Sequence, residues 1–149
     1  MKHKVGMSTN QIIDSPKNIS SFIGCFPCNN IPIVKYYPSS FIVNTDKNNQ
    51  PGTHWVAIYM TEKTCFFFDS FGESIQEYDI KFFLKQYYQR VIYNLTQIQD
   101  YNSIRCGEFC VNFVRYVTNK NTYVKFINEF VKIDLLKNDV ILKNMMKCR

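Results

Sequence analysis

Long hydrophobic runs are absent from this sequence of 149 residues. Apolar stretches such as residues 55–60 and 65–68 are far shorter than the roughly 20 residues that cross a bilayer. The N-terminus also lacks the apolar core of a secretory signal peptide. We therefore expect a soluble protein with no membrane partner.

Histidine is scarce and cysteine is unevenly placed. The two histidines are His3 and His54. The six cysteines are Cys25, Cys28, Cys65, Cys106, Cys110 and Cys148. Cys25 and Cys28 resemble half of a zinc site, but neither a second close cysteine pair of that type nor a spaced histidine pair completes it. Without a secretory signal we expect reduced thiols rather than disulfides, no metal and no required cofactor.

Acidic residues are outnumbered by basic ones, 12 to 18, and the net charge is +6. No nucleic-acid-binding motif accompanies this charge. A solvated surface and weak, sequence-independent binding to a polyanion such as DNA are equally compatible with it. With 46% hydrophobic and 16% aromatic residues, the chain can bury the core of one compact domain. We expect residues 1–149 to form a single domain and a monomer.

The N-terminal third predicts little regular structure. A weak helical pattern runs from Ile12 to Ile23, is interrupted by Pro16 and ends at Gly24. Prolines between residues 25 and 40 favour an irregular connection. A brief apolar strand at residues 41–43 and a polar, turn-rich loop then lead to His54.

Two apolar runs, residues 55–60 and 65–68, predict a β-hairpin that is buried on both faces. His54 immediately precedes the first strand, and Asp69 immediately follows the second. Neighbouring antiparallel strands lie about 5 Å apart. Because the start of one strand faces the end of the other, we expect His54 and Asp69 to be in contact.

The segment after the hairpin predicts a helix and then a strand. Apolar residues at helical spacing indicate a helix over residues 75–90. Alternation over residues 91–95 indicates a strand that continues toward Gln99.

An apolar stripe from Phe109 to Val117 predicts an amphipathic helix in the last third of the chain. Cys106 is then expected at or beside the N-terminus of this helix. A last helical region over residues 123–146 is expected to break near Asn138.

The placement of Cys106 favours a nucleophile. A helix N-terminus offers unpaired N–H groups and partial positive charge, and a neighbouring imidazolium adds more, so both favour a thiolate. His54 is the candidate base and Asp69 the carboxylate that orients it. Gln99 and the backbone N–H of Cys106 are candidate donors to the oxyanion. Together these groups predict acyl transfer by a cysteine peptidase.

Each residue also has an ordinary explanation. Cys110, one turn after Cys106, fits an inert packing residue. Taken singly, His54 fits a strand-end histidine, Asp69 a turn residue and Gln99 a surface amide. Their order and spacing together favour the catalytic interpretation.

Four parts of the sequence resemble the adenovirus-type endopeptidase family, the adenain-like cysteine proteases of the same clan as the SUMO-deconjugating peptidases. These parts are residues 42–45 with 52–55, residues 68–72, residues 97–103 and residues 106–110. The resemblance implies an α+β fold with a mixed, mainly antiparallel central sheet flanked by helices. It also implies a papain-like arrangement with the nucleophile at a helix N-terminus.

The resemblance assigns roles to the same residues. It implies that His54 is the base, with Trp55 packed beside its ring. Asp69 becomes the acidic member, Gln99 the oxyanion donor and Cys106 the nucleophile.

The resemblance further implies cleavage of viral precursor proteins during virion maturation, after Gly-X-Gly or Gly-Gly motifs. The expected location is the virion and the nucleus or cytoplasm of the infected host cell. Adenoviral enzymes are stimulated by DNA and by an activating peptide that forms a disulfide with an enzyme cysteine. Residues 87–93 hold no such cysteine. We therefore expect DNA or peptide stimulation, if any, without a disulfide.

The chain departs from the family at Asp69 and Ser70, where an acid-proline pair is common. This departure indicates a divergent relative, either from another virus or from a Polinton-like or virophage-like element. A SUMO-type deconjugating isopeptidase would use the same groups with a broad exosite. The seven positions from Gln99 to Cys106 are one more than in typical SUMO peptidases and favour the viral enzyme. A non-enzymatic binding protein is expected to lose Cys106, His54 or Gln99, and all three are present.

Overall fold

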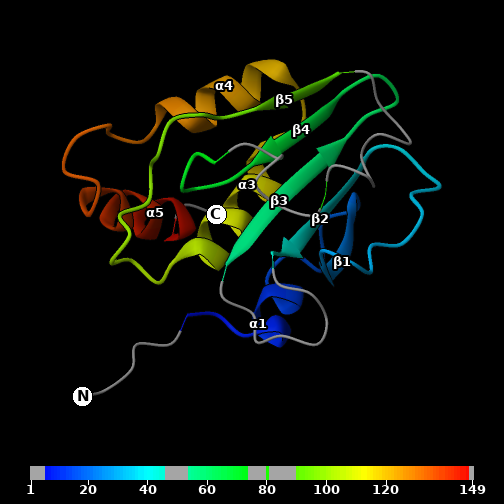
Figure 1. Ribbon diagram of the computed structural model, residues 1–149, viewed down its shortest axis with the longest axis horizontal. Helices are drawn as coiled ribbons and strands as arrows, with labels where there is room; N and C mark the ends of the chain where they lie inside the picture. The colour runs from blue at the N-terminus through cyan, green and yellow to red at the C-terminus, as the bar shows by residue number, and fades with distance from the viewer. Residues whose placement is uncertain (1–5, 46–53, 74–79, 81–89, 148–149) are drawn as a thin grey trace.

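The computed structural model describes residues 6–45, 54–73, 80 and 90–147. These residues form an α+β fold around a five-stranded mixed sheet whose strand order follows the chain (Figure 1). The strands are β1 (Phe22–Pro27), β2 (Ser39–Asn44), β3 (Trp55–Met60), β4 (Cys65–Phe68) and β5 (Val91–Tyr93). The fold class expected from the sequence is confirmed.

The central hairpin forms as predicted, with the predicted bounds. β3 pairs antiparallel with both β2 and β4, and Ala57 lies opposite Phe68. The two outer strands pair in parallel, β1 with β2 and β4 with β5. Every residue of β3 and β4 is buried, as continuous apolar strands require.

Four described helices accompany the sheet: α1 (Thr9–Asp14), α3 (Cys106–Tyr116), α4 (Lys120–Asn128) and α5 (Lys137–Lys147). Helix α3 lies behind β3 and β4 in Figure 1 and packs on β3, while α4 and α5 pack on α3. Among the described residues, no helix is both long and apolar enough to cross a membrane.

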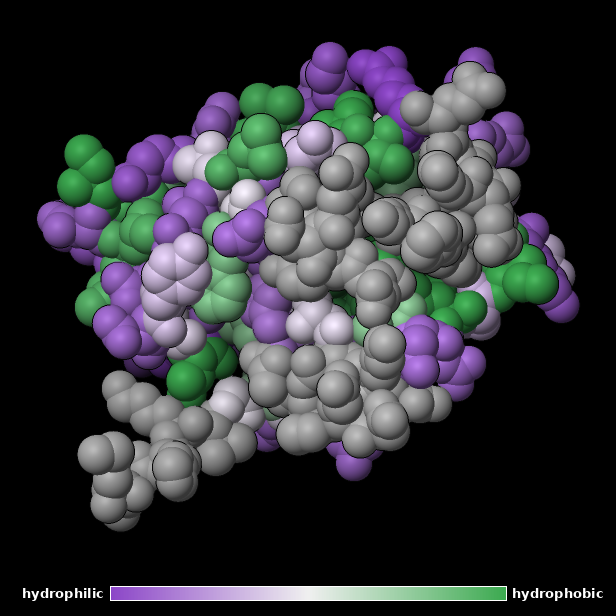
Figure 2. Space-filling model, in the orientation of Figure 1, coloured by the Kyte–Doolittle hydropathy of each residue, from purple (hydrophilic) through white to green (hydrophobic). Residues whose placement is uncertain are grey.

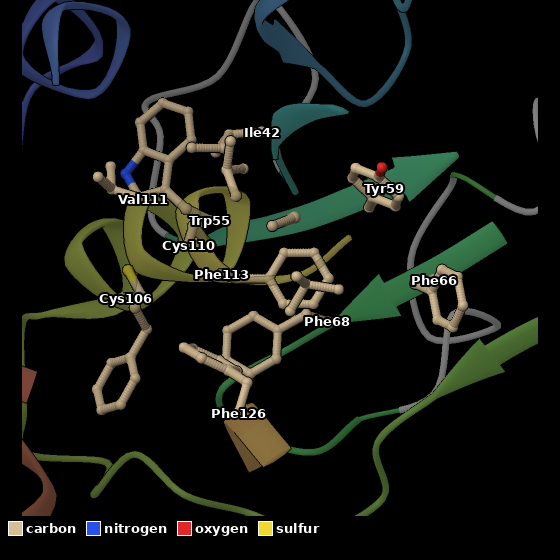
Figure 3. Packing of buried hydrophobic residues seen from close by; sticks show 14 of the residues in the cluster. Ile42, Trp55, Tyr59, Phe66, Phe68, Cys106, Cys110, Val111, Phe113 and Phe126 are labelled. Atoms are coloured by element: carbon tan, nitrogen blue, oxygen red, sulfur yellow. The ribbon is translucent and has the colours of Figure 1, made fainter. Parts of the chain in front are cut away.

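Aromatic side chains fill the space between α3 and the sheet (Figure 3). Phe68 of β4 stacks on Phe113 of α3 with ring centroids 5.0 Å apart, and Phe126 of α4 meets both rings edge-on. Full burial of a side chain of this size stabilises the folded state by about 1.5–3 kcal/mol. These contacts therefore fix the helix that begins at Cys106 against the hairpin.

The opposite face of the sheet carries a second core. Phe41, Ile58 and Phe67 point into it, and the connection after β1 covers them with Cys28 and Val34. On the outer surface, hydrophilic and hydrophobic side chains are mixed over the coloured part of the face in Figure 2.

Strand β1 was not predicted: the weak helical pattern extended to Ile23, whereas α1 ends at Asp14, and the prolines after residue 25 favoured an irregular connection. As an edge strand it pairs on one side only, and Pro27 stands at its last position, where a missing N–H is tolerated. Gly24 has φ 139° and lies where the register with β2 shifts after Phe22. Glycine adopts this conformation without steric cost.

Two other predictions differ from the structure, and a third stays a prediction. Strand β5 ends at Tyr93, earlier than predicted. The helix predicted over residues 75–90 lies outside the described residues except for Ile80 and Arg90. The break in the last helical region precedes Asn138 instead of falling on it, because the buried Asn138 side chain donates to the carbonyl oxygens of Ile98 and Val131 at 2.7 and 2.9 Å.

Candidate active site

His54 and Asp69 meet at the end of the hairpin, as strand geometry predicted. His54 precedes β3, Asp69 follows β4, and His54 Nε2 lies 2.6 Å from Asp69 Oδ1. Asp69 is fully buried and His54 is 8% exposed. A hydrogen bond of this kind fixes the orientation of the imidazole ring and leaves Nδ1 for the thiol.

Backbone amides hold the Asp69 carboxylate in place. Phe71 N donates to Oδ1 at 2.9 Å and Glu73 N donates to Oδ2 at 3.2 Å. The Asn94 side chain forms two hydrogen bonds with the backbone of Asp69. Asp69 N donates to Asn94 Oδ1 at 3.1 Å, and Asn94 Nδ2 donates to the Asp69 carbonyl oxygen at 2.6 Å. Sequence reasoning missed Asn94, because a polar residue after a short strand carries no periodic signal.

The pKa of His54 is raised from 6.5 to about 9. Burial lowers it, but the hydrogen bonds to Asp69 and Cys106 and the negative charges of these two residues outweigh burial. His54 is therefore protonated at neutral pH, and the three side chains form one electrostatic unit.

Cys106 is the first residue of α3, where the sequence placed it. Cys106 is 9% exposed and lines the same cleft as His54. A backbone N–H in the first turn has no acceptor within the helix, so that of Cys106 can serve a ligand. Figure 3 shows Cys106, Cys110 and Phe113 following one another along α3.

Cys110 has a different environment from Cys106. It is fully buried, and its pKa is raised well above 9.0, first by burial and then by the charges of Cys106, Asp69 and Cys25. Such a thiol stays neutral and acts in packing. Among the described cysteines none forms a disulfide.

Gln99 lies in the segment between β5 and α3 and is fully buried, although its side chain lines the cleft with Cys106 and His54. Gln99 Nε2 donates to the Ser103 carbonyl at 2.9 Å. An amide nitrogen carries two N–H groups, so one remains for a ligand beside the thiol. The structure thus brings His54, Gln99 and Cys106 to one cleft, with Asp69 buried behind His54 and hydrogen bonded to it.

The loop before Cys106 is anchored to both neighbouring helices. Ser103 Oγ donates to Asp139 Oδ1 of α5 at 3.0 Å, and Arg105 N donates to Ser103 Oγ at 3.3 Å. Arg105 also pairs with Glu108 of α3 at 2.7 Å. These contacts position the Ser103 carbonyl that Gln99 uses.

Phe71 forms a wall of the site that the sequence did not reveal. Its ring stacks on His54 with centroids 4.4 Å apart, and Tyr101 lies 5.1 Å beyond it. A ring face over an imidazolium stabilises the cation. Trp55, expected beside the imidazole from the family resemblance, lines the same cleft.

The cleft has a volume of about 620 Å³, and its opposite wall is the N-terminal segment Gly6–Thr9. A Cβ added to Gly6 would lie 2.6 Å from the Ile104 carbonyl oxygen, so only glycine fits this close approach. Within the described part of the chain, no three metal-binding side chains gather.

In this α+β fold, a cysteine at a helix N-terminus lies beside a histidine that is hydrogen bonded to an aspartate. This arrangement defines the class of papain-like cysteine peptidases. The adenovirus endoprotease family matches residues 22–146, and the chain belongs to this family. Family and class are therefore those expected from the sequence. No curated protein matches the chain.

Among solved structures, the crystal structure of the ASFV pS273R protease is similar to this chain. The two are 20% identical, with a TM-score of 0.43, over 71% of this chain and 42% of that one. The chain thus aligns with less than half the length of that protein.

Proposed function

We propose that the chain is a cysteine endopeptidase that cleaves viral precursor proteins during virion maturation. The observation that carries the proposal is that His54 contacts both the Asp69 carboxylate and the Cys106 thiol in an open cleft. Family membership supports protein substrates and a viral setting. It also supports cleavage after Gly-X-Gly or Gly-Gly motifs.

In the first half of the proposed reaction, the Cys106 thiolate bonds to the scissile carbonyl carbon and the carbonyl electron pair moves to oxygen. Gln99 Nε2 and the Cys106 backbone N–H donate to this oxyanion. When the intermediate collapses, the C–N bond breaks and His54 gives its proton to the leaving amine. A thioester on Cys106 remains.

In the second half, His54 removes a proton from water while the water oxygen bonds to the acyl carbon. Collapse expels the Cys106 thiolate and releases the carboxylic acid product. His54 is again protonated, so thiolate and imidazolium are restored together. Asp69 keeps Nε2 occupied throughout, which directs both proton transfers through Nδ1.

The test is turnover of peptides that contain Gly-Gly or Gly-X-Gly, with Cys106→Ala as the inactive variant. Cys110→Ala is the matched control, because it removes a thiol one turn away that only packs. We expect cleavage by the wild type and Cys110→Ala, and none by Cys106→Ala. Turnover by Cys106→Ala would refute the proposed nucleophile. Preferential cleavage of C-terminal amides of ubiquitin-like modifiers would instead identify a deconjugating isopeptidase.

The proposal includes weak stimulation by DNA. Exposed lysines gather in the C-terminal third of the chain: Lys120, Lys125, Lys132, Lys137, Lys143 and Lys147. Binding to phosphates releases counterions, so stimulation should weaken as salt rises. Turnover measured with added duplex at low and high salt tests this. Indifference to DNA at both salts would assign the charge to surface solvation.

We further propose that residues 1–149 act as one domain and as a monomer, in the virion and in the infected cell. The described sheet and its two cores support a single folding unit. Light scattering on the active protein tests the monomer, and a stable dimer would refute it.

A further inference from the structure

Ser70 contacts Gln99 on the side away from Ser103. It immediately follows Asp69 in the turn after β4 and is fully buried. Ser70 Oγ is hydrogen bonded to Gln99 Oε1. An amide oxygen can only accept, so the Ser70 hydroxyl is the donor.

The two neighbours of the Gln99 amide fix which way it faces. The Ser103 carbonyl oxygen can only accept, so it requires Nε2 on its side. The Ser70 hydroxyl donates to Oε1 on the other side. In a flipped amide, two oxygens would face each other at Ser103. One orientation is therefore favoured, and in it the second N–H of Nε2 remains for the cleft.

The backbone of Ser70 strengthens this attachment. Its carbonyl oxygen accepts from Ile98 N and Gln99 N, both at 2.9 Å. Gln99 is thus held to the turn after β4 through its main chain and its side chain. A hydrogen bond donated to an amide oxygen also polarises the amide, which makes its N–H groups better donors.

We propose that Ser70 is a positioning residue that orients and polarises Gln99 as the oxyanion donor. This inference rests on the proposed function. Two consecutive residues then have separate positioning roles: Asp69 orients the base, and Ser70 orients the oxyanion donor. The assignment is specific to this chain where the family commonly has proline, since proline has no hydroxyl.

The test compares Ser70→Ala, Gln99→Ala and the double variant with the wild type on a Gly-Gly peptide. Loss of an ordinary hydrogen bond predicts that Ser70→Ala lowers kcat about tenfold. KM should stay within about twofold, since the bond acts on the transition state. Gln99→Ala should lower kcat about 10²–10³-fold. The double variant should be no slower than Gln99→Ala, because Ser70 acts only through Gln99.

Ser40→Ala is the matched control. Ser40 is also fully buried and its hydroxyl pairs with that of Ser21 at 3.0 Å, but it lies in β2 away from Gln99. Its kcat should equal that of the wild type. If Ser70→Ala does not fold, Ser70→Cys keeps the size with a weaker donor and should give an intermediate kcat.

Alkylation of Cys106 by iodoacetamide separates positioning from a general structural defect, because this reaction forms no oxyanion. We expect an unchanged alkylation rate in Ser70→Ala. A normal kcat in Ser70→Ala, additive effects in the double variant, or slowed alkylation would each overturn the inference. A normal kcat in Gln99→Ala would instead refute the oxyanion role in the proposed function and the inference with it.

Discussion

Replacement of Asp69 by asparagine removes the charge that holds the proton on His54. The His54 pKa of about 9 exceeds the ordinary value of 6.5 although burial acts in the opposite direction. The difference corresponds to stabilisation of the imidazolium by roughly 3 kcal/mol. Without the hydrogen bond and charge of the carboxylate, the pKa of His54 should fall toward 6.5, with Cys106 left as the remaining group that raises it. The variant would then lose, near neutral pH, the proton that the leaving amine needs.

The expected loss depends on pH in a way that can be calculated. Near pH 8 the protonated fraction of His54 would fall about thirtyfold if its pKa dropped to 6.5. Near pH 6 the imidazole is mostly protonated in both proteins, so any deficit there reports lost orientation instead. We therefore expect kcat/KM of Asp69→Asn to fall at both pH values, and by about thirtyfold more near pH 8.

The assay is the pH profile of kcat/KM on a Gly-Gly peptide, with Asp134→Asn as control. Asp134 is an exposed aspartate at φ 56°, which asparagine also tolerates, and it is remote in sequence from the hairpin. For the wild type and the control, kcat/KM should fall on the alkaline side of the pH profile with a midpoint near pH 9, the alkaline limb. An alkaline limb that stays near pH 9 in Asp69→Asn would refute the role of Asp69.

The same raised pKa links stability to pH. Because the folded state favours protonated His54, this stabilisation is complete below pH 6.5 and is lost as pH rises through about 9. Urea unfolding of the wild type should show a larger fall in the free energy of unfolding over this range than Asp69→Asn. Equal falls would contradict the linkage.

Three further substitutions test the surroundings of the proposed catalytic residues. Phe71→Leu removes the ring stacked on His54 and should shift the alkaline limb of kcat/KM to lower pH, by less than Asp69→Asn does; an unchanged limb would show that the stack does not stabilise the cation. Asn94→Ala removes two hydrogen bonds to the buried backbone of Asp69 and should cost about 1–3 kcal/mol in thermal unfolding, whereas an unchanged Tm would contradict this. Gly6→Val forces the N-terminal segment away from the Ile104 carbonyl and should raise KM for peptides without slowing iodoacetamide; an unchanged KM would show that this wall does not contact substrate.

The hairpin and the contact at its end were predictable because two physical rules sufficed. Continuous apolar residues identify buried strands, and strand spacing places His54 beside Asp69. The helix of Cys106 was predictable from its apolar stripe. Gln99 carries no periodic signal of its own; its place in the order of candidate residues suggested an oxyanion donor, and the resemblance to known peptidases supported that role.

The remaining features depend on tertiary contacts that no local pattern encodes. Strand β1 forms despite Pro27 because an edge position tolerates a proline. Asn94 and Phe71 follow the ends of short strands, where neither periodicity nor spacing indicates a partner. The segment before Asn138 stays non-helical because the buried Asn138 side chain bonds to it.

These contacts converge on the turn after β4. Asp69 contacts His54, the proposed base; Ser70 contacts Gln99, the proposed oxyanion donor; and Phe71 stacks on the imidazole. Asn94 in turn fixes the backbone from which all three project. The turn follows directly from β4, which ends at Phe68 and is buried on both faces, so a rigid strand supports it. In the proposed mechanism, Cys106 on α3 therefore meets a base and an oxyanion donor that are already aligned with each other, because one short turn sets the position of both.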